Sequence, residues 1–311
     1  GHATNGVENL LGLVMDSTPT THASVLLERD VNVVEFCPQE GLTHLLAAGT
    51  YTLHEKGGNR DGTLHLFNVR QDKVLDPCEE LDERTGIRSW DLNEFASCEP
   101  TDAVFDLKWA PPDHPASTQL GGDTSCALLA QAGTSGMVSM YRCSDFGIET
   151  VQEVECSQEH GLCTSVDWSH QNSGSSFLAS STSSCEIVVF DAAAQSGLVP
   201  IVSMPGAHDL ETWMVAFDRW QPMLLFSGAD DCAFKAWDLR LAGTDPDHAP
   251  GAALQQRSSN RRVHTAGVCC INPSPWEEHV VVTGSYDESV RVWDTRNLSR
   301  AVGVVTGELA T

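Results

Sequence analysis

Short apolar runs separated by turn residues dominate this chain. Between residues 31 and 300, runs rich in Val, Leu, Phe and Trp alternate with clusters of Gly, Asp, Ser and Pro. Such runs are typical of β-strands, and no stretch keeps the period of 3.6 residues that would predict a long helix. The pattern therefore predicts an all-β protein.

The apolar runs group into five units of similar layout. They cover residues 31–69, 101–143, 162–191, 208–240 and 264–296. Three or four short strands repeated in series predict the blades of a β-propeller. A blade buries its faces only against neighbouring blades, so such a unit is stable only within a series.

The last two units match each other position by position. In both, a histidine precedes an aspartate by 23 positions, a tryptophan follows that aspartate by six, and the unit closes on Trp-Asp-x-Arg. The matched residues are His208, Asp231 and Trp237 in one unit and His264, Asp287 and Trp293 in the next. A fixed spacing of this kind indicates a repeat architecture.

The units divide the chain into three parts. Residues 1–30 are expected to be an extension that contributes one strand of a closing blade, residues 31–300 form the blades, and residues 301–311 form a short divergent tail. Polar, Gly-rich or Pro-rich composition predicts three exposed connections between or within the blades. They are residues 70–100, 111–125 and 242–262.

Composition restricts the classes of partner. The net charge of −25 argues against DNA or RNA, because contacts with phosphate need Lys and Arg. Eleven cysteines without a Cys-x-x-Cys pair argue against a disulfide framework and a zinc site, so we expect no metal and no cofactor. We therefore expect a reducing compartment, namely the cytoplasm, with the nucleus as an additional location. No apolar run reaches membrane-spanning length, and no membrane partner is expected.

The repeated residues resemble the WD-repeat proteins. In that family, His, Ser or Thr, Asp and Trp form a hydrogen-bonded set within each blade. The resemblance places these roles on His208, Ser227, Asp231 and Trp237, and on His264, Thr283, Asp287 and Trp293. It implies a WD-repeat β-propeller with five blades visible here, whereas seven are expected in a complete relative.

A closer resemblance extends over about residues 31–300. The segments HLLAAGTY, AHDLETWMVAFDRW, VHTAGVCCINPSP and TGSYDESVRVWDTRN are similar to the WD-repeat proteins of diphthamide biosynthesis, the diphthine methyl ester esterases, also called diphthine methyltransferases. The resemblance implies a hydrolase that removes the methyl ester from methylated diphthine on translation elongation factor 2, a protein demethylation. That factor would be the protein substrate.

No nucleophile can be chosen by motif, because the chain lacks the Gly-x-Ser-x-Gly signature of α/β-hydrolases. Candidate catalytic residues are Glu211, His208 and Asp230, although the spacing of His208 equally predicts a structural role. The trimethylammonium group that the resemblance implies would suit Trp213, with Tyr286 as a second binding residue. The alternatives are a packed Trp213 and solvated turns at Asp230 and Tyr286.

The two Trp-Asp-x-Arg sequences support a second hypothesis. They resemble the paired motifs with which WD-repeat substrate receptors dock on the adaptor of cullin-4 ubiquitin ligases. Arg240 and Arg296 would make that contact, and the protein would then be a non-catalytic scaffold. The alternative is that each arginine pairs with the acidic residue of its own motif.

Overall fold

A computed structural model describes residues 23–55, 58–71, 90–98, 102–120, 125–156, 161–170, 176–194, 196–240 and 255–307. The chain forms two compact units. One comprises Gly1–Leu26 and Arg70–Leu92, and its described part is limited to residues 23–26, the end of β5 and the start of β6. The other comprises Leu27–Val69 and Asn93–Thr311 and contains the repeats.

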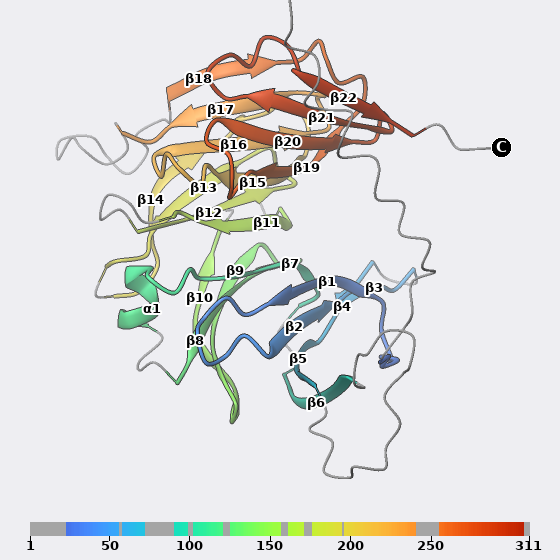
Figure 1. The fold of residues 1–311 in the computed structure, drawn as a ribbon, viewed down its shortest axis with the longest axis vertical. Coiled ribbons are helices and arrows are strands. Elements are labelled where there is room, and N and C mark those ends of the chain that lie inside the picture. Colours follow the sequence, from blue (N-terminus) through green and yellow to red (C-terminus); the bar gives the residue numbers. More distant parts are fainter. Residues whose placement is uncertain are drawn as a thin grey trace, which may run out of the picture. The chain divides into compact units, whose positions relative to one another are not determined.

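Five four-stranded sheets make up the architecture (Figure 1). Sheet one contains β1 (Val31–Phe36), β2 (Leu45–Thr50), β5 (Leu64–Gln71) and β6 (Trp90–Cys98). Sheet two contains β7 (Val104–Trp109), β8 (Ala127–Gly133), β9 (Met137–Ser144) and β10 (Gly147–Glu155). Sheet three contains β11 (Cys163–Trp168), β12 (Phe177–Thr182), β13 (Ile187–Asp191) and β14 (Val199–Met204).

The two matched repeats form the remaining sheets. Sheet four contains β15 (Thr212–Phe217), β16 (Leu224–Ala229), β17 (Phe234–Asp238) and β18 (Gln255–Asn260). Sheet five contains β19 (Val268–Pro273), β20 (Val280–Ser285), β21 (Ser289–Asp294) and β22 (Gly303–Thr306). A small pair, β3 (Thr52–Leu53) and β4 (Arg60–Asp61), extends from sheet one, and a short helix, α1 (Pro115–Gln119), precedes β8.

The first strands of successive sheets lie next to one another. Strand β1 contacts β7, β7 contacts β11, β11 contacts β15, and β15 contacts β19. Each sheet runs in chain order from this inner strand outwards, which is the arrangement of propeller blades. The described residues therefore form a five-blade β-propeller arrangement, and the predicted all-β fold is confirmed.

Side chains of one inner strand supply acceptors to the backbone of the next. The carboxylates of Glu35, Asp106 and Asp167 accept hydrogen bonds from the backbone N–H groups of Trp109, Val166 and Phe217, at 3.1, 3.1 and 2.7 Å. An inner strand is the edge of its sheet, so its buried N–H groups would otherwise lack partners. These bonds join blade one to two, two to three and three to four.

Indole groups reinforce the same contacts. Trp109 donates from Nε1 to the carbonyl of Glu35 at 2.9 Å, and Trp168 donates to the carbonyl of Lys108 at 3.0 Å. Both rings are buried, and burial of an aromatic ring accounts for much of the energy of such an interface. The sequence pattern predicted that Trp109 and Trp168 lie in strands. Their hydrogen bonds to the neighbouring blade could be seen only once the sheets were assembled.

Three segments predicted to be exposed connections contain regular secondary structure, so these predictions were wrong in part. Residues 90–98 and 255–260 form β6 and β18 rather than loops, and residues 115–119 form α1 inside a predicted turn. Strand β22 likewise extends sheet five into the predicted tail. An outermost strand packs on one side only, so it needs no regular apolar pattern, and β18 reads Gln-Gln-Arg-Ser-Ser-Asn. The predicted strand within residues 1–30 lies outside the described residues for positions 1–22.

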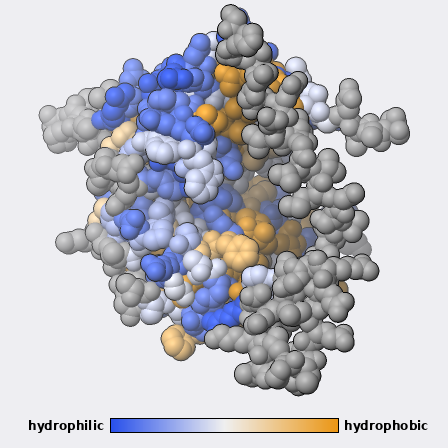
Figure 2. All heavy atoms as spheres, in the orientation of Figure 1, coloured by the Kyte–Doolittle hydropathy of each residue, from blue (hydrophilic) through white to orange (hydrophobic). Residues whose placement is uncertain are grey.

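Exposure differs between the end blades and the central ones. All six residues of β11 are buried, whereas β1 exposes Val31, Val34 and Phe36 by 51 to 57%. Sheet five also exposes Val304 and Val305, which lie on its outermost strand β22. Figure 2 shows apolar surface over these two regions between hydrophilic areas. An inner strand is fully covered only where a blade packs on both sides of it. No helix within the described ranges is long and apolar enough to cross a membrane.

Candidate functional site

The structure brings together the four residues of each predicted repeat set. His208 Nε2 lies 2.7 Å from Ser227 Oγ, its Nδ1 lies 3.0 Å from Asp231, and Trp237 Nε1 donates to Ser227 Oγ at 2.8 Å. The same three distances in blade five are 2.7, 3.0 and 2.8 Å. The blade-five residues are His264, Thr283, Asp287 and Trp293.

Both histidines are enclosed by their sets. Burial lowers the pKa of His208 and of His264, and the neighbouring aspartates only partly oppose this. The His208 side chain is fully buried and both its ring nitrogens are bonded within the protein. A substrate cannot reach the enclosed ring, so the geometry argues against the catalytic role predicted for His208 and favours the structural alternative.

Each inner strand carries a bulge near its start. The pairing register shifts once at Asn32, Phe105, Thr164, Trp213 and Cys269, one residue per blade. A bulge leaves one residue outside the ladder and redirects its side chain. These equivalent positions were not visible in the sequence, because the five residues differ in chemistry.

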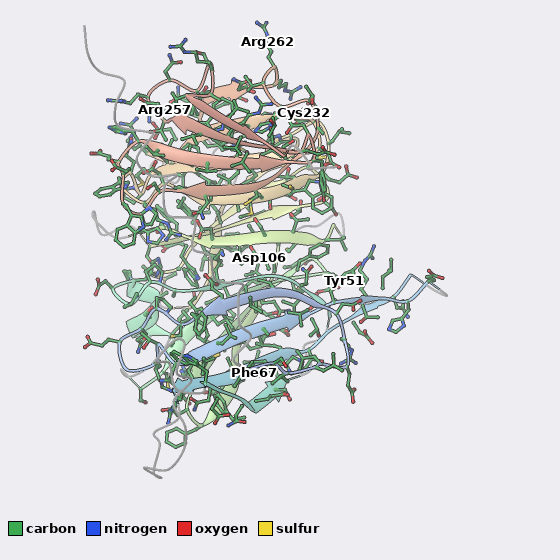
Figure 3. All side chains as sticks on the ribbon, turned by 45° about the vertical axis from the view of Figure 1, so that its right-hand side comes forward. Tyr51, Phe67, Asp106, Cys232, Arg257 and Arg262 are labelled. Carbon is green, nitrogen blue, oxygen red and sulfur yellow. The ribbon has the colours of Figure 1, made fainter. Side chains whose placement is uncertain are left out.

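A repeated hydrogen bond defines what we call the upper rim. The residue after the second strand of each sheet donates its N–H to the residue before the inner strand. The donors are Tyr51, Thr134, Ser183, Asp230 and Tyr286, and the acceptors are Asp30, Ala103, Leu162, Glu211 and Gly267. The five bonds measure 2.9 to 3.1 Å. Figure 3 shows Tyr51 at the same end of the strands as Cys232 of blade four.

The upper rim of blades four and five brings together four of the predicted site residues. Glu211 is exposed, and its carbonyl accepts the hydrogen bond from Asp230 at 3.0 Å. The Asp230 carboxylate lies against Gly267, where a Cβ atom would stand 2.3 Å from Oδ1 and would displace the carboxylate. Tyr286 occupies the equivalent rim position of blade five and is 67% exposed.

Trp213 lies at the bulge directly below Glu211. Its ring is half-buried, and its indole N–H is buried with no acceptor among the residues that the structure describes. A buried donor without a partner costs about 1–3 kcal/mol, which a bound acceptor would recover. A half-buried aromatic ring can contact a cationic group, and the binding role expected for Trp213 stays a prediction.

Blade one adds aromatic character to the rim. The ring of Tyr51 lies 5.4 Å from that of Phe105, the bulge residue of blade two. Asn32, at the bulge of blade one, donates to the carbonyl of Phe105 at 2.7 Å. Sequence reasoning missed these residues, although Tyr51 could have been found by aligning it with Tyr286 after the second strand of each unit.

Titratable groups cluster between the inner strands below the rim. Lys108 Nζ lies 3.5 Å from Glu35, and the Asp106 and Asp167 carboxylates are close enough to influence both. Burial raises the pKa of Glu35 to about 7 despite Lys108, and burial raises that of Asp106 to about 6. Figure 3 shows Asp106 in the middle of the strands, away from the rims.

Replacement of Glu35 by Gln tests this cluster. A carboxyl whose pKa is higher in the folded than in the unfolded state stabilises the folded protein most at pH values below the unfolded pKa. That stabilisation is lost as the pH rises to about 7, the pKa of Glu35 in the folded state. Gln is neutral at every pH. We therefore expect the unfolding free energy of E35Q to equal that of wild type near pH 4.5 and to exceed it by about 1–2 kcal/mol at pH 8. Urea unfolding across this range measures the difference.

The exposed Glu40 provides a matched control for that experiment. E40Q changes the net charge by the same amount and should leave the pH profile of wild type unchanged. The groups facing Glu35, namely Lys108, Asp106 and Asp167, are retained in both variants. A constant difference between E35Q and wild type at all pH values would contradict the assignment.

Arg240 and Arg296 lie at the opposite ends of the strands from the upper rim. Each guanidinium bonds to the aspartate two residues earlier, Asp238 and Asp294, as the alternative interpretation predicted. Both side chains nevertheless remain 69% exposed. They are therefore accessible to a partner, although their charge is partly neutralised.

In the part of the chain that the structure describes, cysteines and metal ligands do not add a second site. Ten of the eleven cysteines lie in the described part of the chain, and all ten are free thiols. Within that part, no three His, Cys, Asp or Glu side chains are placed to hold a metal ion. Burial raises the pKa of Cys37 and Cys98 to about 11, so neither is an activated nucleophile.

Comparison with known proteins supports the repeat assignment. The sequence profile of the WD domain, G-beta repeat, matches residues 256–294, which contain the second of the two hydrogen-bonded sets. The chain is a WD-repeat propeller. This identification agrees with the geometry of both sets and with the series of four-stranded sheets.

Several curated proteins are similar over most of this propeller. The mouse protein named diphthine methyltransferase is 30% identical over 89% of this chain and 55% of its own length. The human protein of that name is 30% identical over 88% of this chain and 58% of its own length. The chain thus spans a little over half the length of these relatives. The Arabidopsis E3 ubiquitin-protein ligase COP1 is 26% identical over 60% of this chain.

Proposed function

We propose that this WD-repeat propeller acts in diphthamide biosynthesis and hydrolyses the methyl ester of methylated diphthine on translation elongation factor 2. The observation that carries the proposal is the 30% identity with proteins named diphthine methyltransferase across 89% of the chain. That name relates the chain to diphthine. The proposed reaction adds water to the ester and releases a carboxylate, methanol and a proton.

The upper rim of blades four and five is the proposed active site. Glu211 would accept a proton from the attacking water, because its carboxylate is exposed. Asp230 is adjacent through the backbone bond and would assist in the same role. The Tyr286 hydroxyl would donate to the oxyanion, and the ring of Trp213 would contact the trimethylammonium group.

The experiment is incubation of the purified protein with the methyl ester form of the elongation factor, without any methyl donor. We expect mass spectrometry to show loss of the ester methyl group and the solution to contain methanol. A methyl transfer reaction would instead require a donor and would raise the mass of the factor. Unchanged mass without a donor would refute the esterase.

A second candidate function is a scaffold or substrate receptor of a cullin-4 ubiquitin ligase. The observation that favours it is the exposure of Arg240 and Arg296 on neighbouring blades. We expect co-precipitation of the ligase adaptor to fall at least about tenfold in the R240A/R296A double variant. Undiminished binding would remove this candidate, and esterase activity should be unaffected because the two regions lie at opposite ends of the strands.

A further inference from the structure

Two adjoining cavities lie at the end of blades four and five that carries Arg240 and Arg296. The first has a volume of about 330 Å³, and its walls include Trp220, Pro222 and Met223. The second has a volume of about 280 Å³, and its walls include Ser258, Thr295 and Asn297. Leu224 and Arg257 line both cavities, so the two form one cleft, which we call the Arg257 cleft.

The Arg257 cleft concentrates positive charge on an acidic protein. The chain has 43 acidic and 18 basic residues, yet Arg240, Arg257 and Arg296 all line this cleft. Arg240 and Arg296 are bound to their own aspartates. Among the described residues, no carboxylate lies within ion-pair distance of Arg257, which is exposed on β18 between the two cavities.

The walls of the cleft differ in chemistry on either side of Arg257. The first cavity is largely apolar, and the Trp220 ring at its edge is fixed by a hydrogen bond from Nε1 to the carbonyl of Ser274 at 3.0 Å. The second cavity offers hydroxyl and amide groups. Asp238 also lines the first cavity and interacts with Arg257 through its charge, but it is bonded to Arg240. An apolar pocket, an exposed guanidinium and a polar pocket that follow one another match an extended peptide rather than a compact small molecule.

We propose that the Arg257 cleft binds an acidic peptide segment of a protein partner. An apolar side chain of the peptide occupies the cavity beside Trp220, and a neighbouring carboxylate pairs with Arg257. The groups of the second cavity bond to the peptide backbone. Arginine suits this contact because its planar fork matches a carboxylate in two parallel hydrogen bonds.

Charge and size select this occupant over others. Nucleic acid needs cationic contacts to many phosphates, whereas this cleft offers three arginines, two of which are bound to their own aspartates. The cleft is divided between two cavities of about 330 and 280 Å³, which suits an extended chain better than one compact cofactor. The cleft also lies away from the upper rim, since Arg257 and Cys232 are at opposite ends of the strands in Figure 3. The inference therefore stands apart from the proposed esterase.

The test uses fluorescence anisotropy with the full chain and a labelled peptide of alternating Glu and Leu. We expect saturable binding, and a peptide with Gln in place of Glu should bind at least about tenfold more weakly. R257E should weaken binding of the acidic peptide by a similar factor. It should also strengthen binding of a peptide of alternating Lys and Leu, which mere loss of folding would not do.

Arg262 supplies the control. It is exposed, follows the end of β18, and points away from Arg257 in Figure 3. R262E changes the charge of the protein by the same amount and should leave the affinity within about twofold of wild type. Absence of saturable binding to wild type, or equal loss in R257E and R262E, would overturn the proposal.

Discussion

Replacement of Glu211 by Gln is expected to reduce ester hydrolysis by about 100-fold while leaving the fold intact. The Glu211 side chain is exposed, and the structural contact of this residue is made by its backbone carbonyl, which Gln retains. Gln cannot accept a proton from water, so the loss should fall on kcat rather than on KM. The measurement is methanol release from the methyl ester form of the elongation factor.

Glu277 offers the matched control for Glu211. It is an exposed glutamate in the turn between β19 and β20, at the far end of the strands from the upper rim. E277Q should keep wild-type turnover, and both variants should melt within about 1 °C of wild type. Full activity in E211Q would remove Glu211 from the proposed mechanism even if the esterase itself is confirmed.

Replacement of Asp287 by Ala is expected to cost about 3 kcal/mol of unfolding free energy, the largest loss of stability among these variants. Burial opposes the charge of Asp287, but hydrogen bonds from Ser289, Thr265 N–H and His264 outweigh it and hold its pKa below the usual value. Alanine removes these bonds together with the ion pair to Arg291, and it leaves the buried imidazole of His264 without its carboxylate acceptor. Urea unfolding at pH 7 measures the loss.

Two comparisons make the Asp287 result specific. D287N keeps an acceptor for His264 and should lose less than half as much stability as D287A. The charge contributes stability above the unfolded pKa of about 4, which is lost as pH falls towards the lowered folded pKa. The stability gap between wild type and D287A should therefore narrow below pH 4. A gap of constant size would show that packing, rather than the carboxylate, holds blade five.

The repeat sets could be predicted from the sequence because each depends on local spacing. A histidine, a hydroxyl residue, an aspartate and a tryptophan at fixed offsets leave few other ways to satisfy their polar atoms within one sheet. The equal intervals from His208 to Asp231 and from His264 to Asp287 were therefore sufficient to predict both hydrogen-bonded sets. The same intervals also predicted that the histidines could be structural, and the buried, doubly bonded ring of His208 favours that alternative.

The outer strands could not be predicted in the same way. Residues 255–260 consist of polar residues, and they pair with β17 because its outer edge is open, not because of their own apolar pattern. Residues 90–98 follow a long polar segment and add to β5 for the same reason. A periodic pattern of apolar residues arises where one face of a strand is buried. An outermost strand buries little surface, so its sequence shows little periodicity.

Sequence by itself determined the all-β class, the repeat and the four-residue sets, because these follow from which side chains recur and at what distance along the chain. Only the tertiary structure decided which residues of neighbouring blades contact each other. It set Glu35 against Trp109, aligned the bulges at Trp213 and Cys269, and joined two cavities at Arg257. Each of these contacts joins residues far apart in the chain, and their proximity is fixed by the packing of whole sheets, which no local spacing encodes.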